Sequence, residues 1–232
     1  MQPSPIIQVL SRYTQNFYPV VPFKPGVDRL LKMDFTAGNK DLSQAVLDDT
    51  GLFTQYIAAR LQAAGCRYGI GGYGEHRTIY SRSTHFDGVG APRRLHLGVD
   101  IWGPVGTPVY AFMGGMVHSV AYNEGFGDYG ATMILLHQLD GIPFYTLYGH
   151  ISRADIKNKS AGEYLIRGQE IAHFGQAEEN GQWPPHLHMQ VVMELGVKKG
   201  DYPGVCAYEE REKYLQNCPD PDLILKMNQY AQ

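Results

Sequence analysis

The segment HLHMQVV, residues 186–192, decides how the fold is interpreted. Apolar and polar side chains alternate along it, and this period of two predicts a strand. Residues two positions apart on a strand project from the same face, so His186 and His188 lie side by side while the alternating apolar residues face the core. Two imidazoles on one strand face are suited to bind a metal ion or to transfer protons.

Short segments with the same period of two occupy the chain from Leu97 onward, and turns that contain glycine separate most of them. The uncharged stretch from Ile101 to Asn123 is interrupted by glycine and proline, so it predicts buried strands and not a membrane-spanning helix. The predicted strands are Gly98–Ile101, Thr107–Ala111, Met116–Tyr122, Thr132–Leu136, Pro143–Tyr148, Glu170–Phe174 and His186–Val192.

Both ends of the chain are predicted to be more helical. Thr50–Ala64 carries apolar residues at four-residue spacing and is followed by Gly65, which predicts an amphipathic helix with a glycine stop. Shorter helices are predicted at Asp41–Leu47, Tyr208–Gln216 and Leu223–Met227. The predicted fold class is therefore mainly β (α+β), an antiparallel sheet-based core with helical additions. The predicted parts are a helical N-terminal subdomain with a lead-in loop (1–90), the core (91–200) and a C-terminal extension (201–232).

Composition and charge limit the classes of partner. The 232 residues carry 20 basic and 23 acidic side chains, a net charge of −3, without a cluster of lysine and arginine. Nucleic acids and anionic membranes bind concentrated basic surfaces, so neither is an expected partner. Residues 1–11 contain no basic residue and are interrupted by Pro3 and Pro5, unlike a secretion signal. The expected location is cytoplasmic, with the cell envelope as the alternative if the chain has an upstream signal.

A second cluster of metal-binding residue types is HLGVD at residues 96–100, which brings His96 and Asp100 toward one point. A hydrolytic zinc site needs three protein ligands and one open position. His96, Asp100 and one of the pair His186 and His188 would supply the ligands. The remaining histidine would lie beside the metal as a general base or as a stabiliser of the oxyanion.

Four segments together resemble a known family: HLGVD at 96–100, GTPVYA at 106–111, YGHIS at 148–152 and HLH at 186–188. Their order and spacing are similar to those of the lysostaphin-type (LytM-like) zinc metallopeptidases across about residues 94 to 193. The resemblance implies a sheet-based fold with zinc in a groove, held by His96, Asp100 and His188. It also implies that His150 and His186 are the catalytic histidines. Members of this family mostly cut peptide cross-links in bacterial peptidoglycan.

The resemblance implies a zinc-dependent metalloendopeptidase that hydrolyses a peptide amide bond with metal-activated water, acting on peptidoglycan-like cross-link peptides. One alternative is a cytoplasmic zinc amide hydrolase with a substrate outside the wall. Another is a non-catalytic, metal-stabilised regulatory module, which the presence of all five motif residues disfavours.

The sequence departs from the family pattern near the site. Gln190 stands where the family commonly has glutamate, and Trp183 begins a Trp-Pro-Pro approach where the family has glycine or serine followed by proline. Ala131 occupies a position on the groove wall where asparagine is frequent. Tyr129 and Trp183 are the residues we expect to contact substrate, by stacking, although aromatic residues near a sheet edge are more often packing elements.

Overall fold

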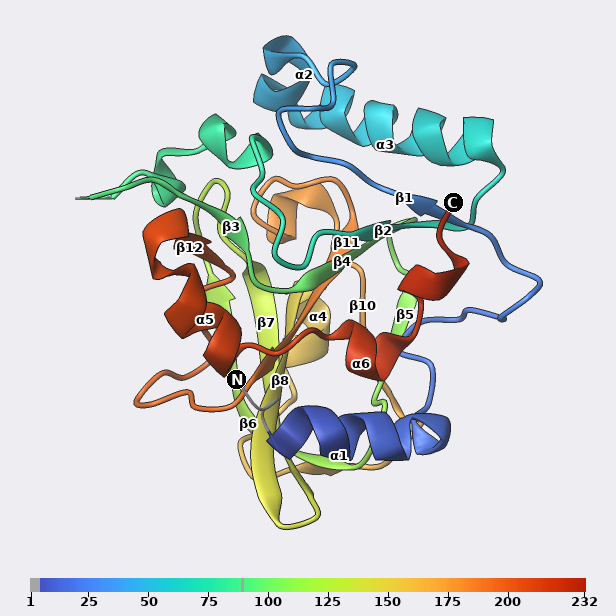
Figure 1. The fold of residues 1–232 in the computed structure, drawn as a ribbon, viewed down its shortest axis with the longest axis vertical. Coiled ribbons are helices and arrows are strands. Elements are labelled where there is room, and N and C mark those ends of the chain that lie inside the picture. The colour runs from blue at the N-terminus through green and yellow to red at the C-terminus, as the bar shows by residue number, and fades with distance from the viewer. Residues whose placement is uncertain (1–4, 89) are drawn as a thin grey trace.

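The fold is built around an eight-stranded sheet in the computed structural model, which describes residues 5–88 and 90–232 (Figure 1). The strands are β1 (Leu30–Lys32), β2 (Tyr68–Gly71), β3 (Arg93–His96), β4 (Val99–Trp102), β5 (Pro108–Tyr110), β6 (Gly115–Asn123), β7 (Gly130–Leu139), β8 (Ile142–Ile151), β9 (Tyr164–Leu165), β10 (Glu170–His173), β11 (His186–Val192) and β12 (Val205–Ala207). The helices are α1 (Pro5–Tyr13), α2 (Gln44–Asp48), α3 (Thr50–Ala64), α4 (Arg153–Ile156), α5 (Arg211–Asn217) and α6 (Asp222–Leu225).

The main sheet has the order β1-β2-β4-β11-β8-β7-β6-β9. Its pairings are antiparallel except that of β1 with β2, and two small sheets, β10-β5 and β12-β3, complete the architecture. The predicted fold class, mainly β with an antiparallel sheet, is confirmed. The predicted strands all form, most of them with ends shifted by one to three residues.

Strand β11 lies in the middle of the sheet, between β4 and β8, and all seven of its residues are buried. Leu187, Met189 and Val191 belong to the largest apolar cluster, as the alternation predicts. His186 and His188 alternate with them and therefore point to the opposite face. Strand β11 thus turns its apolar side chains toward the main core and carries its two histidines on the opposite face, which is also buried.

Helix α3 forms over the predicted range because both of its ends are capped. The Asp49 side chain accepts a hydrogen bond from the backbone of Leu52 at 2.8 Å, and Gly65 ends the helix with a positive φ of 59°. Its buried residues, including Phe53, pack in a second apolar cluster with Trp102 of β4. Figure 1 shows α2 and α3 together above β1 and β2, and α1 at the opposite end of the molecule.

The N-terminal part differs from its prediction, because β1 and β2 join the main sheet where the sequence analysis expects only helices and a loop. These strands have three and four residues, and all four residues of β2 are buried, so no alternation marks them. The division of the chain into three parts stays a prediction. Within the residues that the structure describes, no helix combines the length and the apolar character needed to cross a membrane.

Candidate metal centre

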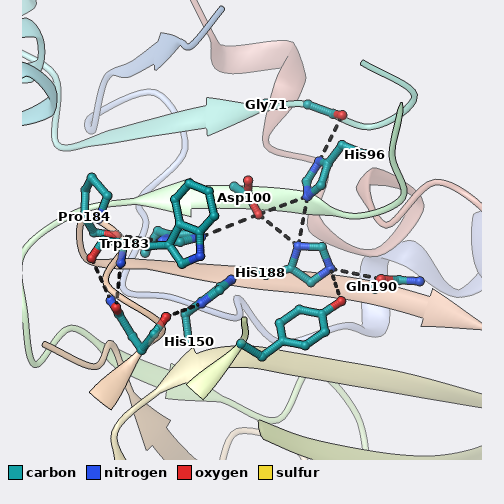
Figure 2. A network of polar contacts seen from close by, with 12 residues as sticks. Gly71, His96, Asp100, His150, Trp183, Pro184, His188 and Gln190 are labelled. Atoms are coloured by element: carbon teal, nitrogen blue, oxygen red, sulfur yellow. Dashed lines mark hydrogen bonds and ion pairs between the residues drawn. The ribbon is translucent and has the colours of Figure 1, made fainter. Parts of the chain in front are cut away.

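The pairing of β11 with β4 brings the first two candidate ligands together. His188 lies directly opposite Asp100 in the register of these strands, and opposed side chains on one sheet face are close neighbours. His188 Nδ1 is 3.1 Å from Asp100 Oδ1. His96, the last residue of β3, approaches from the side, with Nε2 at 2.9 Å from His188 Nδ1 and 3.3 Å from Asp100 Oδ1. Figure 2 shows the three side chains pointing toward one another.

These three donors fit a zinc ion. Their ligating atoms all lie within 4.8 Å of one another, and all three residues are buried. A tetrahedral zinc ion with bonds near 2.1 Å holds its ligand atoms roughly 3.4 Å apart. The separations of 2.9 to 3.3 Å are slightly shorter than this. Two imidazole nitrogens and one carboxylate oxygen are also a ligand set that zinc hydrolases use.

Outer hydrogen bonds orient both imidazole ligands. His96 Nδ1 donates to the carbonyl oxygen of Gly72 at 3.0 Å, and His188 Nε2 donates to Oε1 of Gln190 at 2.9 Å. In each ring the remaining nitrogen, Nε2 of His96 and Nδ1 of His188, therefore keeps its lone pair and faces the shared point (Figure 2). Histidines that bind metals are typically oriented in this way.

The charges around Asp100 favour the protonation states that metal binding requires. Burial alone would raise the pKa of Asp100, but His96 and the guanidinium of Arg77 hold it well below its usual value. Burial, together with the charge of Arg77, lowers the pKa of His96 to about 3. At neutral pH, Asp100 is therefore ionised and His96 is neutral, as ligands of a divalent cation must be.

A second pair of histidines lies beside the three donors. The ring centroids of His150 and His186 are 4.2 Å apart, and Nε2 of His186 is 4.0 Å from Asp100 Oδ1. His186 donates from Nδ1 to the carbonyl of Pro184 at 2.7 Å, and His150 donates from Nδ1 to the carbonyl of Asn180 at 2.8 Å. In both rings Nε2 is therefore the nitrogen left to accept a proton.

Both histidines of this pair are neutral at neutral pH. Burial lowers the pKa of His186 to about 4. Burial and the neighbouring His186 lower the pKa of His150 well below its usual value. The indole of Trp102 stacks on the ring of His186 with centroids 3.9 Å apart, which fixes its plane.

An unusual backbone conformation turns His150 toward the site. On β8, Tyr148 faces the main apolar cluster and Gly149 lies opposite His188, so strict alternation would send His150 back toward the apolar face. His150 instead has a φ of 61°, in the left-handed region, and its ring lies next to that of His186. Such conformations cost roughly 1–3 kcal/mol in a non-glycine residue and cluster at functional sites.

The predicted substrate contacts, Tyr129 and Trp183, both line the cavity above the candidate ligands. Tyr129 packs on His150 and His188 with centroid distances of 5.4 and 5.3 Å, and its hydroxyl donates to the carbonyl of Tyr202. Only 9% of Tyr129 and 3% of Trp183 are exposed. In the structure both side chains thus pack around the histidines. Their contact with substrate stays a prediction.

The cavity itself has a volume of about 200 Å³. Part of its lining comes from a segment upstream of β3 that contains two short 3₁₀ helices, Ile79–Arg82 and Thr84–Phe86. Tyr80 of this segment contacts Trp183, with ring centroids 6.1 Å apart. The upstream segment therefore covers part of the site, and the five motif residues are between 1% and 6% exposed.

Arg77, which no sequence pattern marks, forms a buried ion pair with Asp100. Its position in a glycine-rich loop carries no motif, and its partner lies 23 residues further along the chain. The neighbouring His76 packs against Tyr208 instead of the candidate ligands.

Three converging donors flanked by two neutral histidines define the class of site found in zinc hydrolases. Residues 94–200, slightly less than half of the chain, match the model of Peptidase family M23. This finding confirms the resemblance to the lysostaphin-type enzymes.

Individual relatives align with part of this chain and are longer than it. The L-Ala–D-Glu endopeptidase of Bacillus subtilis is 30% identical over 161 residues, which cover 62% of this chain and 47% of that protein. The peptidoglycan DD-endopeptidase ShyC of Vibrio cholerae is 32% identical over 112 residues, 44% of this chain and 23% of that protein. The chain thus spans from about a quarter to about half of the length of these relatives. Among solved structures, the catalytic domain of lysostaphin from Staphylococcus simulans aligns with 23% identity over 75% of this chain and 97% of that chain, with a TM-score of 0.43.

Proposed function

We propose that the protein is a zinc-dependent endopeptidase that hydrolyses an amide bond in peptidoglycan-type peptides. The observation that carries the proposal is the convergence of His96, Asp100 and His188 beside the neutral pair His150 and His186. The match to the M23 model supports peptide hydrolysis, and the names of the two relatives support a peptidoglycan-type substrate. Such a substrate would place the activity in the cell envelope, the alternative location of the sequence analysis.

In this proposal His96 Nε2, Asp100 Oδ1 and His188 Nδ1 hold the zinc ion. When bound, zinc supplies Lewis acidity and lowers the pKa of water, the chemistry that amide hydrolysis needs at neutral pH. The hydrogen bonds to Gly72 and Gln190 keep the two imidazole ligands oriented.

His150 and His186 provide proton transfer. Each presents an unprotonated Nε2, because its Nδ1 proton is hydrogen-bonded to a backbone carbonyl. One of the two takes the proton of the attacking water at Nε2. The rings are so close that a proton on one disfavours a second proton on the other. The pair therefore carries one proton at a time, which it can deliver to the departing amine.

The test is digestion of purified peptidoglycan and of oligoglycine peptides, with and without a chelator. We expect release of soluble peptides from at least one substrate, loss of this activity with the chelator and its recovery after zinc is added back. His150→Ala and His186→Ala are each expected to lower the rate by about 10²–10⁴-fold, the usual contribution of a general acid or base.

Full hydrolysis by both histidine variants would overturn their assigned role. Protein that holds zinc with an intact site yet cleaves neither substrate would overturn the proposed substrate class and favour an amide substrate outside the wall or a regulatory role.

A further inference from the structure

Arg77 is a buried charge that lies outside the matched domain. Its side chain is 1% exposed, and it precedes the first residue of the M23 match by 17 positions. Nε donates to Oε2 of Glu75 at 2.7 Å, Nη1 donates to Oδ2 of Asp100, and Nη2 lies 3.3 Å from the carbonyl oxygen of Gly71. A buried guanidinium is tolerated only when it is paired and hydrogen-bonded in this way. These contacts fix its position from three directions.

The loop that carries Arg77 is shaped to reach the candidate ligands. Gly71, at the end of β2, pairs with Asp100 of β4, so the chain leaves the sheet directly beside the carboxylate. Gly72 then adopts a φ of 105°, and its carbonyl accepts the hydrogen bond from His96. A Cβ atom at Gly72 would lie 1.8 Å from Arg77 Nη2 and 2.9 Å from His96 Nδ1. Only glycine fits there, because the guanidinium and the imidazole already occupy the space.

The two carboxylate oxygens of Asp100 have different partners. Oδ2 is paired with Arg77, whereas Oδ1 faces His188 Nδ1 at 3.1 Å and His96 Nε2 at 3.3 Å. Without the guanidinium, Oδ2 would be a buried oxygen that lacks its cationic partner, and the carboxylate would be free to rotate. Such a rotation would turn Oδ1 away from the two imidazole nitrogens and break the donor set.

We propose that Arg77 is a positioning residue of the metal centre, which holds Asp100 with one carboxylate oxygen turned toward the two imidazole nitrogens. The loop from Gly71 to Arg77 then belongs to the metal centre, although it lies upstream of the residues that match the M23 model. This inference rests on the zinc site of the proposed function but not on the identity of the substrate.

The test measures zinc affinity by competition with a chromophoric chelator in the wild-type protein and in Arg77→Met, which keeps the length of the side chain but not its charge. We expect Arg77→Met to bind zinc about 10–100-fold more weakly, the usual effect of removing an outer partner of a metal ligand. Arg77→Lys should recover part of the affinity, because an ammonium group can pair with Asp100 but cannot also reach Glu75 and Gly71. Arg82→Met is the matched control, since Arg82 is a second buried arginine that packs on Phe53 and Trp183 instead of a candidate ligand.

Two further measurements separate positioning from general stability. In an Asp100→Asn background, Arg77→Met should have little additional effect on zinc affinity, because no carboxylate remains to be held. The visible absorption spectrum of the cobalt(II) protein should change in Arg77→Met and return toward the wild-type spectrum in Arg77→Lys. If Arg77→Met does not fold, zinc affinity is compared between the wild-type protein and Arg77→Lys, and between Asp100→Asn with and without Arg77→Lys.

The possible results distinguish this inference from the proposed function. Wild-type zinc affinity in folded Arg77→Met, or an equal loss in Arg82→Met, overturns the role of Arg77 alone. A wild-type protein that binds no zinc overturns both proposals. A protein that binds zinc through Arg77-dependent positioning but cleaves no peptidoglycan overturns only the proposed substrate.

Discussion

Replacing Gln190 by glutamate, the residue common in the family, should destabilise this protein at neutral pH. Both ends of the Gln190 amide are used: Oε1 accepts from His188 Nε2 at 2.9 Å, and Nε2 donates to the carbonyl of Pro203 at 3.1 Å and lies 3.2 Å from Cys218 Sγ. The side chain is fully buried. A carboxylate keeps the acceptor for His188 but turns a second oxygen toward the Pro203 carbonyl.

The size of the effect follows from the lost donor and the buried charge. A buried carbonyl that loses its partner costs about 1–3 kcal/mol, and a carboxylate without a donor on its second oxygen adds to that. If the carboxyl takes up a proton, it can donate to Pro203 again, so the folded variant should have a pKa above the usual value near 4.3. The deficit relative to wild type should therefore be small below about pH 4 and grow as the pH rises toward the folded-state pKa.

Urea unfolding of the metal-free proteins at pH 5 and pH 8 measures this deficit. Gln190→Met is the control, because it removes both hydrogen bonds without adding a titratable group and should lose stability equally at both pH values. A Gln190→Glu protein as stable as wild type at pH 8, or a deficit that does not grow with pH, would refute the reasoning.

Three further predictions concern stability. Burial lowers the pKa of His137 to about 4 from its usual 6.5, so between these pH values the unfolded chain binds a proton that the folded chain does not. Protonation of His137 in the unfolded chain should therefore lower the free energy of unfolding by about 3 kcal/mol as the pH falls through this range. His137→Gln should flatten the pH dependence of the free energy of unfolding in urea, and an unchanged pH dependence would contradict this. Gly149→Ala would place a Cβ 2.6 Å from Cδ1 of Tyr129 and should cost about 1–3 kcal/mol through overpacking, which a smaller residue at position 129 should partly relieve. Phe53→Ala should cost about 3–5 kcal/mol, because this fully buried ring packs on Phe35 and Trp102; a shift in the melting temperature of less than a degree would show that α3 contributes little to the fold.

Local patterns in the sequence predict much of the fold. Helix α3 is visible because its apolar spacing and its glycine stop lie within one segment. Strand β11 is visible because it alternates, and the same alternation places His186 and His188 on one face. The strand β2 is not visible, because it is short and buried on both faces.

The site is predictable only as far as its motifs extend. The four motifs, in their order along the chain, identify the three candidate ligands and the two further histidines. In the structure these five side chains lie close together. Two features depend on tertiary context: the left-handed backbone of His150 and the pairing of Arg77 with Asp100. The partner of an isolated arginine in a loop is set by the pairing of β2 with β4, which no local pattern reveals.

Zinc content and affinity in single-site variants test the central claim most directly. The wild-type protein should bind one zinc ion per chain, His188→Ala should lose the tightly bound ion, and His186→Ala should keep it, because His186 lies beside the donors and is assigned to proton transfer. A His188→Ala protein that still binds one zinc ion per chain with wild-type affinity would contradict the ligand set. Loss of zinc in folded His186→Ala would contradict the division between ligands and catalytic histidines.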